Sequence, residues 1–160
     1  MFRDCSSFSS DDDYMTPKSA WEEIAQFLPR DKVIWECFYG DGKSGAYLRE
    51  LGFEVIHENV DFFHNDLGDI LVSNPPYSMK KEVFTRLKEL EKPFIMLVPT
   101  TTLHTKYFKE LFVDDHIQVI LPHKKRHFTS NKKDLKKSGC AFYTCYVCYR
   151  MELPKDVILL

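Results

Sequence analysis

The sequence predicts a three-layer α/β fold, in which helices cover both faces of a mainly parallel sheet. Short apolar runs rich in Val, Ile, Leu and Phe alternate with longer segments whose apolar residues recur at helical spacing. Such alternation is typical of crossover units that join parallel strands. The chain has 160 residues, of which 44% are hydrophobic and 29% charged, and this suffices for one domain with its own core.

The predicted elements follow in chain order. Residues 1–13 are rich in Ser and Asp and are expected to form a flexible lead, whereas residues 14–160 are expected to form the single domain. Thr16 and Pro17 predict a helix start, with Thr16 as the N-cap and Pro17 in the first turn, and Pro29 ends that helix. Strands are predicted at 33–36, 53–57, 69–73, 93–98, 116–121 and 141–151, an edge strand at 157–160, and helices at 44–51, 79–90 and 103–111.

Composition excludes several functional classes. No apolar stretch approaches the roughly 18 to 20 residues that span a bilayer, so no membrane contact is expected, and the polar start does not resemble a signal peptide. Five cysteines without framework spacing indicate reduced thiols in an intracellular protein. The net charge of -2 hides a basic block at 124–137, where seven Lys or Arg and one Asp give +6. Such a block can follow a phosphate backbone, although a solvated loop explains the charge equally well.

A glycine-rich turn follows the first strand. Gly40, Gly42 and Gly45 fit the pattern Gly-x-Gly-x-x-Gly, which allows a tight turn and a close approach of backbone to a ligand. A phosphate-binding P-loop would also require glycine at position 37, which is Cys37. The turn therefore predicts a binding loop of another kind.

Two acidic residues bear on the ligand of this turn. Glu58 lies 18 residues after Gly40, a spacing that leaves a dinucleotide-binding fold open. Glu36, at the end of the first strand, would repel a pyrophosphate and favours a cationic group. The ammonium and sulfonium of S-adenosylmethionine are such groups.

The motif Asn74-Pro75-Pro76-Tyr77 ends the strand at 69–73. The two prolines fix the turn and leave backbone carbonyls as acceptors, while Asn74 offers a side-chain oxygen. Tyr77 offers a ring face for stacking. The motif therefore suits an amino group on a planar conjugated system, such as adenine, cytosine or a carboxamide.

With both motifs, the chain resembles the class I S-adenosylmethionine-dependent methyltransferases, and within them the amino-methyltransferases that carry Asn-Pro-Pro-Tyr. The overall pattern is similar to small DNA adenine-N6 methyltransferase-like proteins of large DNA viruses and phages, and it covers residues 14–151. The resemblance implies a Rossmann-like methyltransferase fold, S-adenosylmethionine as cofactor and DNA, rather than RNA, as the favoured partner.

The resemblance also implies roles for individual residues on the cofactor side. Glu58 would accept hydrogen bonds from the ribose hydroxyls, Asp61 would accept from the adenine amine, and the Phe62 ring would pack on an adenine face. The segment that contains Thr16 would close over the methionine end. The full set implied for the cofactor is Tyr14, Thr16, Glu36, Phe38, Gly40, Gly42, Glu58, Asp61, Phe62 and Asn74.

On the acceptor side, Asn74, Pro75, Pro76 and Tyr77 would form the catalytic loop. The Asn74 oxygen and the Pro75 carbonyl would hold both N–H bonds of the target amine, while Tyr77 stacks on the base. Phe128 would pack on the other face of the base. This chemistry needs no metal ion. The residues implied for target binding are Tyr77, Phe128, Lys124, Lys125 and Arg126.

The chain departs from the family in two ways. Only a few residues separate Glu58 from Asp61, where most relatives place a helix and a third strand, so we expect a trimmed sheet. We also expect that no target-recognition domain follows the core and that a partner subunit supplies specificity. Three alternatives stay open: an RNA base as acceptor, a protein glutamine as acceptor, or a non-catalytic cofactor-binding subunit.

Overall fold

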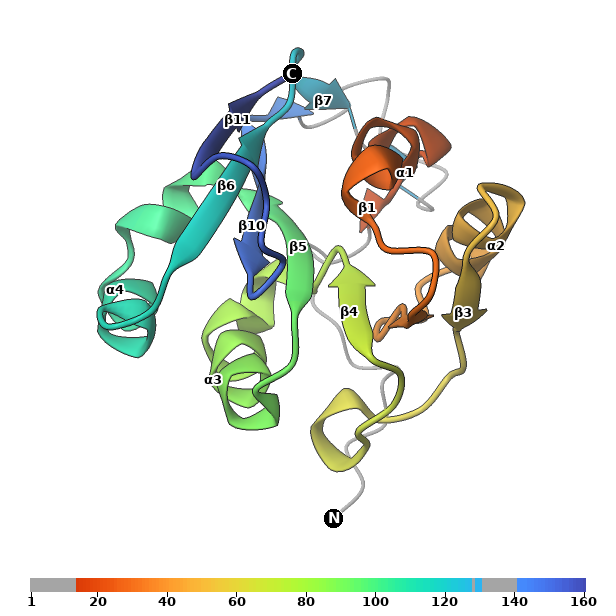
Figure 1. The fold of residues 1–160 in the computed structure, drawn as a ribbon, viewed down its shortest axis with the longest axis horizontal. Coiled ribbons are helices and arrows are strands. Elements are labelled where there is room, and N and C mark those ends of the chain that lie inside the picture. The colour runs from red at the N-terminus through yellow and green to blue at the C-terminus, as the bar shows by residue number, and fades with distance from the viewer. Residues whose placement is uncertain (1–13, 128, 131–140) are drawn as a thin grey trace.

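A seven-stranded sheet forms the centre of the computed structural model, which describes residues 14–127, 129–130 and 141–160 (Figure 1). Its strands are β2 (Val33–Trp35), β3 (Glu54–Ile56), β4 (Ile70–Ser73), β5 (Phe94–Pro99), β6 (Ile117–Leu121), β10 (Thr144–Tyr149) and β11 (Val157–Leu159). Their order across the sheet is β11-β6-β10-β5-β4-β2-β3, and β10 alone runs antiparallel to its neighbours in this sheet. The predicted mainly parallel sheet is therefore confirmed.

Helices cover both faces of this sheet, as predicted. They are α1 (Lys18–Ile24), α2 (Lys43–Glu50), α3 (Lys80–Leu90) and α4 (Lys106–Phe112), with the short 3-10 helices η3 (Ala25–Phe27), η5 (Tyr77–Met79) and η6 (Thr100–His104) beside them. Trp21 of α1 and Leu48 of α2 belong to the core on one face. Phe84 of α3 and Phe108 of α4 belong to the core on the other, with ring centroids 5.3 Å apart. Among the described residues, no helix is long and apolar enough to cross a membrane.

The strand side chains divide between these two cores by the period-two alternation of a strand. In β5, Ile95 and Leu97 join the core beneath α1 and α2, whereas Met96 and Val98 join the core beneath α3 and α4. All four side chains are buried, because a central strand has a helical layer on each side. This explains why the sequence of β5 is a continuous apolar run rather than an alternating one.

The segment before α1 differs from the prediction. Helix α1 begins at Lys18 with Pro17, in extended backbone, at the N-cap, and no side chain caps it. The Thr16 hydroxyl instead accepts a hydrogen bond from the Asn74 side chain, so Thr16 is not the N-cap. Tyr14–Met15 form β1, which pairs antiparallel with β8 at Thr129–Ser130. The leading segment is thus tied to two distant parts of the chain.

The sheet is trimmed between β3 and β4, as predicted, and β11 extends it beyond β6. Between β3 and β4 the chain forms only the 3-10 helix η4 (Phe62–His64), without a further strand. Beyond β6, the parallel strand β11 adds an edge. The short strands β7 (Arg126–His127) and β9 (Ala141–Phe142) pair with each other, and β10 then returns antiparallel between β5 and β6.

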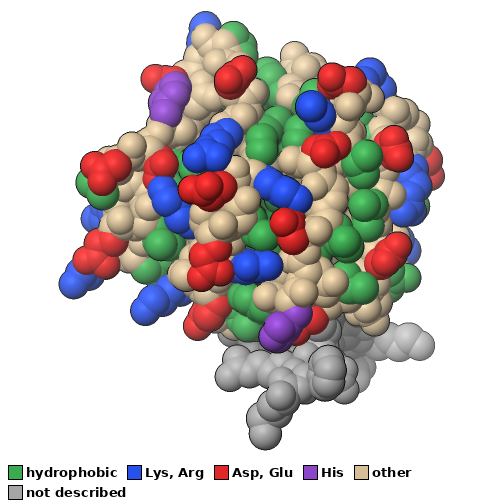
Figure 2. Space-filling view, turned by 60° about the horizontal axis from the view of Figure 1, so that its bottom comes forward, with side chains coloured by type: hydrophobic (Ala, Val, Ile, Leu, Met, Phe, Trp, Pro, Cys, Tyr) green, Lys and Arg blue, Asp and Glu red, His purple; other side chains and the backbone are tan. Residues whose placement is uncertain are grey.

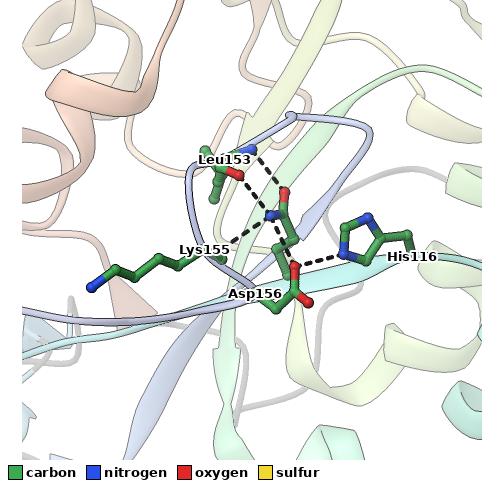
Figure 3. Close-up of polar contacts among 5 residues, drawn as sticks. His116, Leu153, Lys155 and Asp156 are labelled. Carbon is green, nitrogen blue, oxygen red and sulfur yellow. Dashed lines mark hydrogen bonds and ion pairs between the residues drawn. The ribbon is translucent and has the colours of Figure 1, made fainter.

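A buried glutamine attaches the loop that leads into β11 (Figure 3). Gln118 Nε2 donates to the carbonyls of Leu153 (2.9 Å) and Lys155 (3.0 Å), while its Oε1 accepts from the Leu153 N–H at 2.8 Å. Asp156 accepts from His116 at 2.6 Å in the same group of contacts. The side-chain amide of Gln118 is therefore fully used in holding this loop.

Candidate functional site

The two sequence motifs meet at the carboxyl edge of the sheet. Glu36 follows β2 directly and Ser73 ends β4, and these strands are parallel neighbours. The Ser73 hydroxyl donates a hydrogen bond to Glu36 Oε1, and this bond joins the glycine-rich turn to the segment that begins at Asn74. The chain leaves β2 for β3 on one side and reaches β4 on the other, so the site lies at a topological switch point.

Glu36 is a buried carboxyl group without a cationic partner. Its side chain is 1% exposed, and within the described ranges it forms no ion pair. The groups that hydrogen-bond to it are neutral: the Ser73 hydroxyl and the N–H of Phe38, the latter at 3.2 Å. Burial raises the pKa of Glu36 to about 8, and these hydrogen bonds offset only part of that effect. A cationic ligand beside Glu36 would favour its ionised form.

The glycine-rich turn has the backbone conformation that its glycines permit. Gly40 has φ of +57°, and Gly42, at the N-cap of α2, has φ of +81°. Phe38 is half-buried before them and packs on Phe62 at 5.0 Å between ring centroids. The two glycines therefore leave backbone uncovered by side chains of their own at the carboxyl end of β2, beside the exposed side chain of Tyr39.

His57 holds this turn against the end of β3. Its Nδ1 accepts from the Gly45 N–H at 3.0 Å, and its Nε2 lies 3.4 Å from the Phe38 carbonyl. A Cβ at Gly45 would lie 2.3 Å from His57 Nδ1, so the third glycine of the pattern provides room for this ring. We assigned no role to His57 from the sequence. Its place at the carboxyl end of a strand was the signal that could have found it.

In the Asn-Pro-Pro-Tyr segment, the nitrogen of the Asn74 side-chain amide has a hydrogen-bond partner and the oxygen has none among the described residues. Asn74 Nδ2 donates to the Thr16 hydroxyl at 3.0 Å. Its Oδ1 is buried and accepts no hydrogen bond from the residues that the structure describes. Pro75 and Pro76 are buried, and Tyr77 is half-buried, with a pKa raised by burial. An acceptor oxygen is thus fixed in place and left for a donor.

The remaining cofactor-side residues lie after β3. Glu58 is exposed two residues beyond that strand. Asp61 caps η4: its Oδ1 accepts from the Phe63 N–H at 2.8 Å and its Oδ2 lies 2.6 Å from His64 Nδ1. Phe62 is 2% exposed and packs on Trp35, so it belongs to the core, and Phe63 is the more exposed of the two rings.

The three basic residues at 124–126 differ in exposure. Lys124 and Lys125 are exposed, and Lys125 Nζ lies 4.8 Å from the ring centroid of Tyr143. Arg126, predicted to contact phosphates, is only 8% exposed, and its guanidinium is paired with Glu23 of α1. This pairing neutralises the Arg126 charge inside the protein and does not favour a phosphate contact, which stays a prediction for this residue. Phe128 lies outside the described residues, as does the lead at 1–13.

Comparison with known proteins gives a likeness of fold. No family model and no curated protein matches the chain. A solved structure from Pyrococcus horikoshii, provisionally assigned as an RNA methyltransferase, matches with a TM-score of 0.54 at 14% identity, over 96% of this chain and 95% of that one. A provisionally assigned class I S-adenosylmethionine-dependent methyltransferase from Listeria monocytogenes matches with a TM-score of 0.52 at 16% identity, over 96% of this chain and 67% of that one.

Proposed function

We propose that this chain, which has the fold of class I S-adenosylmethionine-dependent methyltransferases, transfers a methyl group from that cofactor to an exocyclic amine. Adenine N6 in DNA is the acceptor that the sequence favours. The observation that carries the proposal is the Ser73–Glu36 hydrogen bond, which brings a buried carboxyl group and the Asn74 amide to one edge of the sheet.

The cofactor side fits the chemistry of the donor. Glu36 would pair with the methionine ammonium, which supplies the positive charge that its surroundings lack. The backbone of Gly40 and Gly42 can approach the ligand closely, because neither residue has a Cβ. Glu58 is exposed after the neighbouring strand, where it can accept hydrogen bonds from ribose hydroxyls. Asp61 can still receive an amine, because each carboxylate oxygen accepts more than one hydrogen bond.

The acceptor side fits an amine. The free Oδ1 of Asn74 and the carbonyl of Pro75 are acceptors, and two N–H bonds of one amino group would satisfy both. Holding both hydrogens pulls the nitrogen toward tetrahedral geometry and directs its lone pair. When bound, S-adenosylmethionine would supply an electrophilic methyl group: the nitrogen would form the new bond to carbon, the electrons of the broken carbon–sulfur bond would stay on sulfur, and one proton of the amine would leave to solvent. The protein then contributes alignment and hydrogen bonding in a site sheltered from water.

A tritium-transfer assay tests this proposal. Labelled cofactor is offered with separate pools of DNA, RNA and protein, and label is expected in DNA. Asn74→Ala should reduce transfer about 100- to 1000-fold, the usual cost of removing a polar group that stabilises a transition state, with cofactor affinity nearly unchanged. Asn65→Ala, which removes a side-chain amide that donates to the Asp61 carbonyl, is the control. Full activity of Asn74→Ala would contradict the proposal.

The same assay separates the alternatives. Label in the RNA pool would favour an RNA base, and label in the protein pool would favour a glutamine carboxamide. Cofactor binding without transfer to any pool, with or without a partner subunit, would favour a non-catalytic subunit.

The two exposed lysines give a test of nucleic-acid binding. Replacing Lys124 and Lys125 with Ala should weaken DNA affinity severalfold and lower the slope of log K against log salt by about two, since each phosphate contact contributes about 0.9. The matched control replaces two exposed lysines of α4, Lys106 and Lys109. Equal losses in both pairs would mean that residues 124–125 do not form a specific contact.

A further inference from the structure

We infer that His57 is a positioning residue for the cofactor turn, and that it works only as the neutral imidazole. The inference rests on the proposed function, because it concerns the affinity of that turn for S-adenosylmethionine. His57 does not belong to either sequence motif. Its ring nevertheless bonds the turn at two points, Phe38 and Gly45, on either side of the glycines at 40 and 42.

The hydrogen bonds fix the tautomer. The Gly45 N–H can only donate, so Nδ1, at 3.0 Å, carries no hydrogen. The hydrogen of the neutral ring is then on Nε2, which donates to the Phe38 carbonyl at 3.4 Å. One ring thus receives a bond from the start of α2 and gives a bond to the residue before the turn. The distance between Phe38 and Gly45 is set by the width of the imidazole.

Packing leaves this ring little freedom. His57 is 8% exposed, and its ring centroid lies 5.0 Å from that of Tyr39, the turn residue before Gly40. The Gly45 backbone passes so near the ring that any Cβ there would overlap it. The turn therefore cannot shift toward β3 without displacing His57, and loss of the ring would leave space into which the turn can move.

Protonation would break the arrangement. A proton on Nδ1 would face the Gly45 N–H, so a hydrogen bond would be replaced by two opposed donors. Burial is the main cause that lowers the pKa of His57, and the Arg49 charge on α2 acts in the same direction. The Phe38 and Tyr39 backbone and the Asp41 carboxylate act in the opposite direction. The neutral ring therefore prevails at neutral pH, and the charged ring gains only below the ordinary histidine pKa of about 6.5.

Calorimetry with S-adenosylmethionine from pH 8 to pH 5 tests the inference with two substitutions. His57→Asn places an acceptor oxygen near the position of Nδ1 and does not titrate. It keeps the bond to Gly45 and loses the longer one to Phe38, so it should bind about twofold to threefold more weakly than the natural protein at pH 8. His57→Leu offers no acceptor and should bind about tenfold more weakly at every pH, the cost of one buried hydrogen bond to an unpaired donor. His116→Asn, at the opposite edge of the sheet, is the control for histidine loss.

The diagnostic quantity is the ratio of the two dissociation constants, natural protein over His57→Asn. Other groups, Glu36 among them, titrate in both proteins, so their effects on the dissociation constant cancel in the ratio. We expect this ratio to lie slightly below one at pH 8 and to rise about tenfold by pH 5. A flat ratio, or a His57→Leu variant that binds normally at pH 8, would overturn the inference and leave the proposed function intact. Absence of binding in the natural protein at every pH would overturn both.

Amide hydrogen exchange of the cofactor-free variants guards against misfolding as the explanation. In His57→Leu, the Gly45 amide should exchange faster than in the natural protein, while amides of β4 and β5 keep their protection. Unchanged protection at Gly45 would overturn the inference, since the hydrogen bond on which it rests would then be unimportant.

Discussion

Polar groups differ between the side of the central sheet where its parallel strands begin, here called the amino edge, and the side where they end, the carboxyl edge. At the amino edge, Gln118 has its amide bonded to the chain at both ends, and Lys88 is paired with Asp115. Figure 2, with the bottom of Figure 1 turned toward the viewer, shows acidic and basic side chains interspersed over that face. At the carboxyl edge, Glu36 is buried without a cation and Asn74 Oδ1 is buried without a donor, within the part of the chain that the structure describes.

This difference separates polar groups that stabilise the fold from polar groups that are available to a ligand. Polar groups that are satisfied by the protein contribute to one stable fold, and a ligand would have to compete with their existing partners. Polar groups that are buried and unsatisfied cost stability, and such a cost is expected where a ligand is to supply the missing partner. The contrast predicts that substitutions at the carboxyl edge change binding or catalysis, whereas those at the amino edge change stability alone.

The largest expected effect on cofactor affinity is that of Glu36→Gln. Loss of the carboxylate should weaken S-adenosylmethionine binding about 10- to 100-fold, since a hydrogen bond to a charged group contributes about 1.5–3 kcal/mol. The same variant should be more stable than the natural protein at pH 9, because a neutral amide in this buried place carries no desolvation cost for a charge. Calorimetry and urea unfolding measure the two effects. A variant that loses stability and keeps its affinity would contradict this account of Glu36.

The pH dependence of that stability has a definite sign. The folded state holds the pKa of Glu36 at about 8, above the ordinary value of 4.5, so the folded state favours the protonated form. Stability should therefore fall as the pH rises from about 4.5 to about 8, by a few kcal/mol at about 1.4 kcal/mol per pKa unit. The difference in unfolding free energy between the natural protein and Glu36→Gln isolates this contribution. A difference that does not change with pH would contradict the uncompensated burial of Glu36.

A smaller effect is expected at Thr16. Thr16→Val keeps the shape of the side chain and removes the acceptor for Asn74 Nδ2, so the amide can turn and lose its catalytic orientation. We expect kcat to fall about fivefold to tenfold, the value of one hydrogen bond, with the KM for the cofactor unchanged. Thr16→Ser should restore kcat. A raised cofactor KM with normal kcat would instead support the direct cofactor contact that the family resemblance implies.

The sequence alone predicted those parts of the molecule that depend on local pattern. Apolar runs predicted each strand of the central sheet within a few residues, because a strand with a helical layer on each side must be continuously apolar. The turn at 40–45 and the motif at 74–77 were each predicted to follow a strand of this sheet. Their placement at one edge followed from parallel strands, whose carboxyl ends lie together.

The remaining features depend on contacts between distant residues. The pairing of Arg126 with Glu23 joins residues 103 positions apart, so a basic run in the sequence could not reveal that one of its charges is buried. The bond between Thr16 and Asn74 spans 58 positions, and it removed Thr16 from the helix cap that local propensity favoured. Tertiary contacts overrode local preference at both places.

The smallest expected effect on function is that of Gln118→Ala at the amino edge. The substitution leaves the backbone of Leu153 and Lys155 without partners and should cost about 1–3 kcal/mol of unfolding free energy. Cofactor affinity and kcat of the folded protein should be unchanged, because the Gln118 side chain and the loop that it holds lie at the other edge of the sheet. A loss of kcat below the melting transition would contradict the division between the two edges.

Hydrogen exchange with and without S-adenosylmethionine is the most direct test of whether the turns at 38–45 and 74–79 bind the cofactor together, because it reports on both turns at once. Bound cofactor should slow exchange of the amides at 38–45 and at 74–79 together, and should leave those at 114–118 and 153–156 unchanged. Slowed exchange at the amino edge, or at one turn without the other, would contradict a shared cleft at the carboxyl edge.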